Sequence, residues 1–354
     1  MRNLFIVDIE PLDGRYTKQW EYWIPELANR ELGNLFNIIP ISGDSEGYKK
    51  PQAGAFFDFA ATCEYKASQA VHISRLFQER KVSSGDVFFF TDAWNQTIHS
   101  VKYMSELTGI SVKLAGIFHA GWYDPTDILG YTIKNSAWAY DLERSYYAAL
   151  DLAFFGTQQH LNKFLRNLNL YQDNKAIVCG YPLEYITNLK NSNNKENIVV
   201  FPHRLNDDKA PWIFDELMLA VQKIRSDIKF IKTQEQGFTK DQYYDFLKTC
   251  KVVFSANKHE NLGIGTFEAM TAGCLPLVPN KLSYEEMYSD DFKYNINSDF
   301  YDSFDKYKDS LVNTIISFID NYDSMKSSTW EADVYRIQEQ FFSGKQMMEY
   351  IKLL

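Results

Sequence analysis

The chain has 354 residues, of which 45% are hydrophobic and 23% charged, a composition typical of a globular protein and not of a disordered or fibrous one. The length predicts two domains, because an ordinary domain has roughly 100–200 residues. The formal net charge of −9 at pH 7 disfavours a wide surface for nucleic-acid phosphates, although it leaves room for a local basic groove. The four cysteines are far apart and form no CxxC pair, so we expect reduced thiols in a cytoplasmic protein rather than a zinc site or disulfides.

The first apolar run, Leu4–Val7, is interrupted by Asp8 and Glu10. It is too short for a signal peptide or for a membrane span of ~20 residues, and we expect it to be a buried strand. Short apolar runs then alternate with longer stretches of helical spacing, which predicts a parallel α/β sheet. The other strands expected in this half are Phe36–Ile41, Val87–Phe90, Val112–Phe118, Leu152–Phe155 and Ala176–Val178.

A polar stretch, Asn191–Glu196, predicts a domain boundary. We therefore expect an acceptor-binding domain over residues 1–190, a nucleotide-sugar-binding domain over 191–330, and a C-terminal helical segment over 331–354 that returns to the first domain. In the second domain the expected strands are Ile198–Phe201, Ile228–Ile231, Val252–Phe254 and Leu275–Val278, and the expected helices are Trp212–Arg225 and Lys240–Leu247. Ligands of such sheets bind outside the carboxyl ends of the strands, so a cleft between two lobes is the expected site.

The segment after the strand Val252–Phe254 reads SANKHENLGIGTFEAMTAGCLPLVPN. It predicts a loop with tight turns at Gly263 and Gly265, a helix over about Thr266–Ala272 with Thr266 as its cap, and a left-handed turn at Gly273. A helix that begins here presents unpaired backbone N–H groups and the positive end of its dipole, the arrangement that commonly binds a diphosphate.

Two carboxylates, Glu260 in the loop and Glu268 in the helix, could face one ligand at different heights. Taken alone, such a pair is more simply a solvated loop residue and a residue that favours the helix dipole. The context favours a ligand site, because HENLGIGTFEAMTAGCLPLVP resembles the E-x7-E segment of family 4 glycosyltransferases, which are retaining enzymes of the GT-B fold. The resemblance implies two Rossmann-like α/β/α domains that face each other across a cleft, with a C-terminal helix packed on the first.

The same resemblance assigns roles to residues of this segment. It places Glu260 near the donor sugar and Glu268 at the nucleotide ribose, while His259 replaces the small or polar residue that is often found there. The other donor-binding residues that it implies are Asn261, Leu262, Gly263, Ile264, Gly265 and Thr266.

A second motif follows the strand Ile198–Phe201, where PHRLNDDKAPWIFDEL places Arg204 and Lys209 five residues apart. Taken alone, Arg204 and Lys209 are most simply interpreted as two surface cations at the start of a helix. The pair is similar to the Arg-x4-Lys element of the same family, and it precedes the two glutamates in the expected order. The two cations could then offset the charge that grows on a departing nucleoside diphosphate.

The first half supplies further candidates at strand ends. His119 follows the strand Val112–Phe118; it is either a cleft-lining residue or, as the resemblance implies, one that positions the donor sugar. Family members commonly have a Gly-rich loop after the first strand, but here that loop contains only Gly14, so we expect Arg15 and Thr17 to serve the phosphate instead. The acceptor-binding candidates are Asp92, Trp94, Tyr123 and Asp124. Trp94 could equally be a core residue.

These features predict a retaining transferase of a hexosyl or pentosyl group from a nucleoside-diphosphate sugar, with a UDP-sugar as the expected donor. We expect no metal and no other cofactor, because the acidic pairs Asp207-Asp208 and Asp290-Asp291 lack the Asp-x-Asp spacing of metal-dependent enzymes.

The sequence does not decide whether the acceptor is a glycan, a lipid or a modified nucleic-acid base. A composition rich in Asn, Lys, Tyr and Phe is similar to phage enzymes that glycosylate hydroxymethylated cytosine in DNA, whose location would be the host cytoplasm, but the negative charge disfavours that acceptor. A nucleotide-sugar epimerase and a non-catalytic sugar-nucleotide-binding protein are the alternatives.

Overall fold

The computed structural model describes residues 1–12, 15–44, 58–189, 194–326 and 328–354. The chain forms two compact units, one built from Met1–Leu183 together with Ser343–Leu354 and the other from Glu184–Phe342. The chain passes from the first unit to the second after residue 183 and returns to the first unit at residue 343, whereas the sequence placed these boundaries after residues 190 and 330. Part of the predicted boundary stretch, residues 191–193, lies outside the described residues.

The first unit contains a six-stranded parallel sheet in the order β2-β1-β3-β4-β5-β6. Its strands are β1 (Arg2–Val7), β2 (Phe36–Ile41), β3 (Val87–Phe90), β4 (Lys113–Ile117), β5 (Leu152–Phe155) and β6 (Ala176–Val178). Strands β3 and β5 are buried along their whole length, as expected of parallel strands covered on both faces. The six predicted strands are therefore confirmed.

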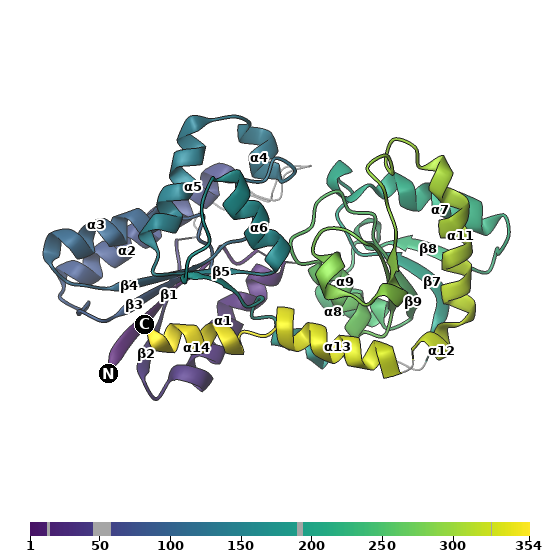
Figure 1. Cartoon of the computed structure of the whole chain (residues 1–354). Coiled ribbons are helices and arrows are strands. Elements are labelled where there is room, and N and C mark those ends of the chain that lie inside the picture. Colours follow the sequence, from purple (N-terminus) through teal and green to yellow (C-terminus); the bar gives the residue numbers. More distant parts are fainter. Residues whose placement is uncertain (13–14, 45–57, 190–193, 327) are drawn as a thin grey trace. The chain divides into compact units, whose positions relative to one another are not determined.

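Helices cover both faces of this sheet (Figure 1). They are α1 (Tyr16–Leu32), α2 (Phe59–Gln78), α3 (Thr97–Thr108), α4 (Ile128–Ile133), α5 (Ala137–Ala149), α6 (Gln158–Asn167) and α14 (Lys345–Leu353). Helix α14 packs against α1. A Cβ atom at Gly344, just before α14, would lie 2.5 Å from Leu27 Cδ2 and 2.6 Å from Pro182 Cβ. This close approach fixes the C-terminal helix to the first unit, as predicted.

The second unit contains a five-stranded sheet in the order β11-β10-β9-β7-β8, and its paired strands are all parallel. Its strands are β7 (Glu196–Phe201), β8 (Lys229–Lys232), β9 (Cys250–Phe254), β10 (Leu275–Pro279) and β11 (Lys293–Tyr294). The first four strands were predicted, but β11 was not, because a strand of two residues leaves no periodic signal in a sequence.

The α-helices of this unit are α7 (Pro211–Gln222), α8 (Lys240–Leu247), α9 (Ile264–Thr271), α10 (Tyr284–Met287), α11 (Asp305–Asp320), α12 (Tyr322–Met325) and α13 (Ser328–Phe341). Short 3-10 turns are η1 (Glu184–Asn188), η2 (Asp207–Lys209), η3 (Thr233–Gln236) and η4 (Asp290–Phe292). Figure 1 shows α7 and α11 on one face of the second sheet, with α8 and α9 on the other.

The C-terminal segment is divided between the units, whereas the sequence predicted one helical segment over residues 331–354 that returns to the first domain. Helix α13 belongs to the second unit, because Trp330 Nε1 donates to the carbonyl oxygen of Cys274 at 3.3 Å and Asp333 Oδ2 accepts from the backbone N–H of Ser289 at 2.9 Å. The helical pattern ends at Phe341, and α14 begins four residues later at Lys345.

Helix α9 begins at Ile264, two residues earlier than predicted. Its N-cap is Gly263, whose φ of +71° lies in the left-handed region that favours glycine. Thr266 therefore lies inside the helix instead of capping it, and its buried hydroxyl is hydrogen-bonded to that of Tyr284 at 3.2 Å. The predicted left-handed turn at Gly273 is confirmed by its φ of +95°.

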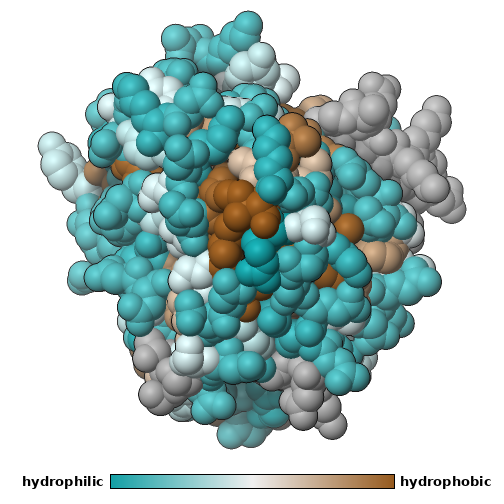
Figure 2. All heavy atoms as spheres, turned by 90° about the vertical axis from the view of Figure 1, so that its right-hand side faces the viewer, coloured by the Kyte–Doolittle hydropathy of each residue, from teal (hydrophilic) through white to brown (hydrophobic). Residues whose placement is uncertain are grey.

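Hydrophobic side chains are concentrated inside each unit, and most of the face in Figure 2 is hydrophilic around a small hydrophobic patch. Scattered exposed apolar residues are normal on globular proteins, and the second unit exposes Leu219 and Ile224 on and just after α7. In the described part of the chain, every helix is too short or too polar to cross a membrane.

Candidate functional site

Each sheet has one point at which the strand order reverses direction. In the first unit, β2 lies on one side of β1 and β3 on the other; in the second unit, β8 lies on one side of β7 and β9 on the other. Ligands of open α/β sheets bind at the carboxyl ends of the strands beside such points. Arg204 follows β7 and Glu260 follows β9, while Asp8 follows β1 and Asp92 follows β3. The predicted polar residues thus collect at both reversal points.

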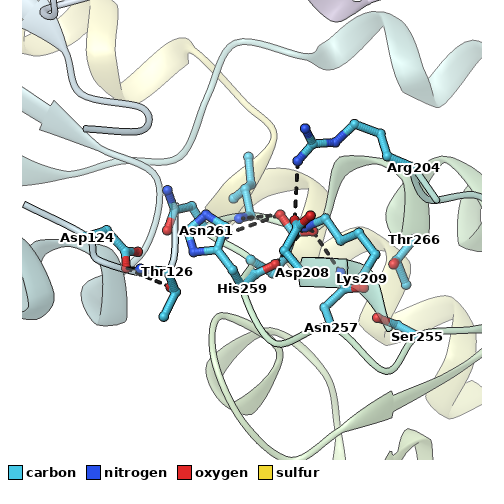
Figure 3. Close-up of polar contacts among 12 residues, drawn as sticks. Asp124, Thr126, Arg204, Asp208, Lys209, Ser255, Asn257, His259, Asn261 and Thr266 are labelled. Atoms are coloured by element: carbon cyan, nitrogen blue, oxygen red, sulfur yellow. Dashed lines mark hydrogen bonds and ion pairs between the residues drawn. The ribbon is translucent and has the colours of Figure 1, made fainter. Parts of the chain in front are cut away.

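In the second unit, four charged side chains form a chain of ion pairs (Figure 3). Arg204 Nη2 lies 3.3 Å from Asp208 Oδ2, and Lys209 Nζ lies 3.6 Å from the same oxygen. Lys209 Nζ also donates to Glu260 Oε2 at 3.2 Å and to the carbonyl oxygen of His259 at 2.6 Å. The structure therefore brings Arg204, Lys209 and Glu260 together, as the two motifs predicted. We call these three residues, together with Asp208, the ion-pair cluster.

The protein holds Glu260 in its ionised form. Burial by itself would raise the pKa of Glu260, but the charge of Lys209 and the weaker effects of neighbouring groups, among them the backbone N–H of Gly263, together outweigh burial and lower the pKa to about 2. The other carboxylate oxygen, Oε1, lies 3.2 Å from the backbone N of Asn261 and 3.4 Å from that of Leu262, and both N–H groups donate to it. Glu260 therefore fixes the loop that leads into α9.

A buried tyrosine, Tyr284, organises the start of this loop. Its hydroxyl accepts from Ser255 Oγ at 3.1 Å and from Asn257 Nδ2 at 3.0 Å, in addition to its bond with Thr266. A Cβ atom on Gly263 would lie only 2.6 Å from Cε1 of this tyrosine. Gly263 is thus required both by its backbone conformation and by the ring beside it. Tyr284 could not be predicted as a partner of this loop, because it lies 18 residues beyond Thr266 in the chain.

Two buried polar atoms beside the ion-pair cluster have no hydrogen-bond partner within the described part of the chain. They are Nε2 of His203, which directly precedes Arg204, and Oδ1 of Asn257, whose Nδ2 donates to Glu260 at 3.0 Å. Burial and the charge of Lys209 lower the pKa of His203 to about 3, so this imidazole is neutral at pH 7. A buried polar atom without a partner is costly, and both atoms would gain one from a polar ligand.

The N-terminus of α9 completes this site. The eight-residue helix begins at Ile264, directly after the loop that Glu260 holds. Its second residue, Gly265, has no side chain that could cover the first turn. The first N–H groups of a helix have no partner inside the helix and lie at the positive end of its dipole. Two cationic side chains and a helix N-terminus at a strand-reversal point form an arrangement suited to an anionic diphosphate.

Glu268, the predicted ribose ligand, lies on α9 with its carboxylate bonded to α8. Oε1 accepts from Lys240 Nζ at 2.7 Å and from the Tyr244 hydroxyl at 2.9 Å, and Oε2 accepts from the Tyr243 hydroxyl at 3.1 Å. These three partners were not predicted, because nothing in the spacing of α8 marks them as ligands of α9.

In the first unit, His119 lies at the end of β4 and has a defined tautomer. Its Nε2 lies 2.7 Å from the carbonyl oxygen of Thr91, which can only accept, so Nε2 carries the proton. Nδ1 lies 3.2 Å from the Tyr16 hydroxyl and accepts from it. Burial lowers the pKa of His119 by more than the nearby charge of Asp92 raises it. At neutral pH the ring is therefore a neutral imidazole.

Asp92 and Trp94, two predicted acceptor contacts, take part in internal bonds. Asp92 forms a buried ion pair with Lys66 of α2 at 2.7 Å, and Lys66 also donates to the carbonyl oxygen of Trp94. Burial opposes ionisation of Asp92, but Lys66 outweighs it and lowers the pKa. Trp94 Nε1 donates to Glu143 Oε1 at 2.7 Å, and burial raises the pKa of Glu143 to about 7. Lys66 and Glu143 were missed because both lie on helices far away in the sequence.

Tyr123, another predicted acceptor contact, has its ring in the core of the first unit, and its acceptor role stays a prediction. The ring is 2% exposed and stacks on His160, and the hydroxyl donates to the carbonyl oxygen of His119 at 3.2 Å. Asp124 forms an ion pair with Lys163 at 2.7 Å and accepts from Thr126, so it holds the loop before α4. Its acceptor role stays a prediction.

The carboxyl end of β1 carries an acidic group, Asp8, which interrupts the first apolar run of the sequence. Asp8 accepts from the hydroxyls of Ser42 and Tyr65, each at 2.6 Å, and burial raises its pKa to about 6. Neither carboxylate oxygen of Glu10, which is 2% exposed, has a partner among the described residues.

The loop after β1 was also predicted to serve the donor phosphate. Arg15 directly precedes α1, while Thr17 Oγ1 accepts from the backbone N–H of Leu12 at 3.2 Å and so holds the loop. The single glycine of this loop, Gly14, lies outside the described residues.

Comparison with known proteins finds sequence relatives and similar solved structures. Over 199 residues the chain is 25% identical to the tRNA-queuosine alpha-mannosyltransferase of Drosophila melanogaster, an alignment that covers 42% of this chain and 53% of the relative. The chain therefore spans about half the length of this curated relative. No protein-family model matches the chain.

Two solved structures of other proteins have a fold similar to that of this chain. A sucrose-phosphate synthase from Thermosynechococcus elongatus superposes with a TM-score of 0.65 and 10% identity, covering 100% of this chain and 98% of its own. A pneumococcal O-GlcNAc transferase in complex with UDP and GlcNAc superposes with a TM-score of 0.53 and 13% identity, covering 81% of this chain and 59% of its own. The chain thus has the GT-B fold that the sequence predicted, whereas membership of family 4 stays a prediction.

Proposed function

We propose that this protein is a glycosyltransferase that moves a sugar from a nucleoside-diphosphate sugar to an acceptor hydroxyl. The observation that carries the proposal is the buried pair of Lys209 and Glu260 at the N-terminus of α9, with Arg204 joined to it through Asp208. Such a site supplies positive charge for a diphosphate and a fixed carboxylate for sugar hydroxyls. The GT-B fold and the partial similarity to a mannosyltransferase support the same reaction.

In the proposed reaction the bond between the anomeric carbon and the diphosphate oxygen breaks, and the acceptor oxygen bonds to that carbon. The acceptor proton leaves with the diphosphate. Because the acceptor oxygen itself attacks the anomeric carbon, no protein nucleophile is required. Arg204, Lys209 and the N–H groups of α9 stabilise the negative charge that grows on the departing diphosphate. Retention at the anomeric carbon is part of the proposal, and the anomeric configuration of the product, measured by NMR, tests it.

Stabilisation of the leaving group by protein cations makes the proposed reaction independent of metal ions. Arg and Lys side chains can neutralise a diphosphate without a divalent cation. Turnover should therefore persist in EDTA and should not rise when Mg²⁺ or Mn²⁺ is restored. Loss of turnover in EDTA that either ion reverses would contradict this part of the proposal.

Two more groups are proposed to hold the donor sugar. The carboxylate of Glu260 has two oxygens already fixed by Lys209 and by the backbone of Asn261, which orients it for sugar hydroxyls. In the first unit, the neutral imidazole of His119 is the side chain that we propose to position the reacting sugar. It can do so without adding a charge, because its pKa is lowered by burial.

The donor is proposed to be a UDP-sugar, as one of the similar structures contains UDP. For the acceptor, the partial match to a tRNA-queuosine mannosyltransferase favours a modified nucleoside of RNA over a glycan or a lipid. The negative net charge predicts that such an acceptor would be recognised mainly at the modified base and not through many phosphates.

A single assay separates the proposed transferase from its alternatives. The protein is incubated with UDP-, GDP- and ADP-sugars, with and without total tRNA, and both released nucleoside diphosphate and sugar products are analysed. A transferase releases diphosphate and labels an acceptor. Conversion of the donor sugar without acceptor would indicate an epimerase, and donor binding without turnover in any acceptor extract would indicate a binding protein.

A further inference from the structure

Glu10 differs from the other acidic groups at the strand-reversal point of the first unit. It follows β1, its side chain is buried, and neither of its carboxylate oxygens has a hydrogen-bond partner in the described part of the chain. We propose that Glu10 binds a positively charged amine of the acceptor, so that the protein selects acceptors that carry one. This inference rests on the proposed function and names a chemical feature of the acceptor.

The neighbouring carboxylate, Asp8, is satisfied by bonds within the protein. Its Oδ1 accepts from the Tyr65 hydroxyl at 2.6 Å and from Gln69 Nε2 at 2.9 Å, and its Oδ2 accepts from Ser42 Oγ at 2.6 Å. These bonds join the ends of β1 and β2 to α2, which is a structural role. Glu10 lies two residues further along the chain and has no such bond to a described group.

The charge of Glu10 also lacks a partner of its own. Lys66 Nζ, the buried cation at this edge, bonds to Asp92 and to the carbonyl oxygen of Trp94, each at 2.7 Å. Burial opposes the charge of Lys66, but Asp92 and, more weakly, Glu10 outweigh burial and raise its pKa. Lys66 is therefore within electrostatic range of Glu10 while its bonds go elsewhere. Because buried charges in proteins are normally paired, a second positive group is expected beside Glu10.

The loop that carries Glu10 is tied to the residue that we propose to position the donor sugar. Thr91 Oγ1 accepts from the backbone N–H of Ile9 at 2.8 Å, and the carbonyl oxygen of Thr91 accepts from His119 Nε2 at 2.7 Å. Glu10 directly follows Ile9, so it lies at the same carboxyl edge of the sheet as His119. An acceptor whose amine binds Glu10 would therefore be held at the edge where the sugar is positioned.

An ammonium group suits Glu10 better than a neutral hydroxyl does. It carries several N–H donors, so it can bond to both carboxylate oxygens, and its charge compensates that of the carboxylate. A hydroxyl donates one hydrogen bond and leaves the buried charge uncompensated. The chemistry of the site thus favours an acceptor nucleoside with an aliphatic amine, which is protonated at neutral pH.

The first test compares three forms of one acceptor preparation. Total tRNA is left untreated, N-acetylated with a succinimidyl ester, or N-methylated by reductive methylation. Acetylation removes the positive charge of aliphatic amines, whereas reductive methylation keeps it and serves as the matched control. With the wild type, acetylation should lower kcat/KM for sugar transfer about tenfold or more, because a bond between charged groups is lost. Methylation should have a much smaller effect.

The second test removes the charge from the protein. Glu10→Gln keeps the shape of the side chain and should raise KM for untreated tRNA about tenfold or more, with little change in kcat. Acetylation of the tRNA should then add little further loss. Glu64→Gln removes an exposed carboxylate of α2 and should behave like the wild type. Both variants should bind UDP-, GDP- and ADP-sugars as the wild type does, which separates acceptor binding from donor binding.

A third readout needs no acceptor. If Glu10 serves a ligand, its buried charge destabilises the free protein, so Glu10→Gln should raise the melting temperature by about 2 °C or more. Asp8→Asn is the contrasting variant and should lower the melting temperature, because it disrupts the bonds to Tyr65 and Ser42. A lower melting temperature for Glu10→Gln would show that Glu10 is structural and would overturn the inference.

The acceptor assays can also contradict the inference. Equal transfer to acetylated and untreated tRNA would exclude recognition of an amine, and an unchanged KM in Glu10→Gln would exclude Glu10 as its partner. If untreated tRNA accepts no sugar although a nucleotide sugar binds, this inference fails while the donor part of the proposed function stands. If no nucleotide sugar binds, the proposed function itself fails.

Discussion

The two strand-reversal points of this protein carry opposite electrostatic arrangements. In the second unit, Arg204 and Lys209 are balanced by Asp208 and Glu260, and the N-terminus of α9 adds positive potential. In the first unit, the carboxylates of Asp8, Glu10 and Asp92 accompany the buried cation Lys66. The strand-reversal point of the second unit, where we propose that the anionic donor binds, is thus the one to which a helix N-terminus adds positive potential.

This difference separates two uses of a buried ion pair. In the second unit, Lys209 bonds to the loop that contains Asn257, whose Oδ1 has no partner among the described residues, a state that favours a ligand. In the first unit, Lys66 and Asp92 bond to each other and to the backbone of Trp94, which favours a structural role. The following predictions test whether the two pairs differ in this way.

The largest expected effect is on the stability of the first unit. Asp92→Asn leaves Lys66 buried without its partner and should lower the free energy of unfolding by about 3–5 kcal/mol. Urea denaturation measures it, with Glu21→Gln as a control, since Glu21 pairs with Lys18 on the surface and should matter by less than about 1 kcal/mol. Equal stability of the two variants would mean that the pair does not stabilise the first unit.

The next effect falls on turnover. Lys209→Ala removes a cation proposed to face the diphosphate and should reduce kcat about 10²- to 10³-fold, by analogy with the loss of one group that stabilises developing charge. Lys229→Ala is the control, because Lys229 forms an exposed ion pair with Glu196. If Lys209→Ala retained full activity, the ion-pair cluster would be structural like the pair in the first unit.

A pH-dependent effect follows from Glu260. Because its pKa is lowered from 4.5 to about 2 in the folded protein, its ionised form contributes stability above pH 4.5 that is lost as the pH falls toward 2. Glu260→Gln should therefore be less stable than the wild type by about 3 kcal/mol at pH 7, on the basis of about 1.4 kcal/mol per pKa unit. Denaturation at pH 7, 4.5 and 3.5 measures the difference, which should shrink only below pH 4.5. A difference that stayed constant down to pH 3.5 would show that the charge of Glu260 is not its source.

The smallest expected effect concerns Trp94. Trp94→Phe keeps an aromatic ring but removes the bond from Nε1 to Glu143, at a cost of about 1.5 kcal/mol when the carboxylate is ionised. Burial raises the pKa of Glu143 to about 7, so the loss should be larger at pH 8 than at pH 6. Trp138→Phe, at a tryptophan that is 58% exposed, is the control. A loss independent of pH would assign the effect to packing instead.

Much of the fold could be predicted from the sequence because parallel strands are short, continuous apolar runs, and Val87–Phe90 and Leu152–Phe155 match the observed strands residue for residue. The start of α9 was misplaced by two residues, because a left-handed glycine outweighed the threonine that resembled a cap. Local signals also left the two-residue strand β11 undetected.

The site was predictable where neighbouring residues in the chain form one motif, as at Arg204 and Lys209. Its supporting partners were not, because they come from other elements. Tyr284 and Lys240 reach the site through tertiary packing, and so does Lys66 in the first unit. The packing of Tyr123 in the core could not be distinguished from a site position, because its place after a strand fits both.

Binding of a nucleoside-diphosphate sugar by the second unit is the central claim, and a thermal-shift titration tests it most directly. UDP-, GDP- and ADP-sugars are titrated into the wild type, Lys209→Ala and Lys229→Ala, since a ligand that binds the folded state raises its melting temperature. At least one of them should raise the melting temperature of the wild type and of Lys229→Ala, with a much smaller shift for Lys209→Ala. No shift of the wild type with any nucleotide sugar would contradict the account.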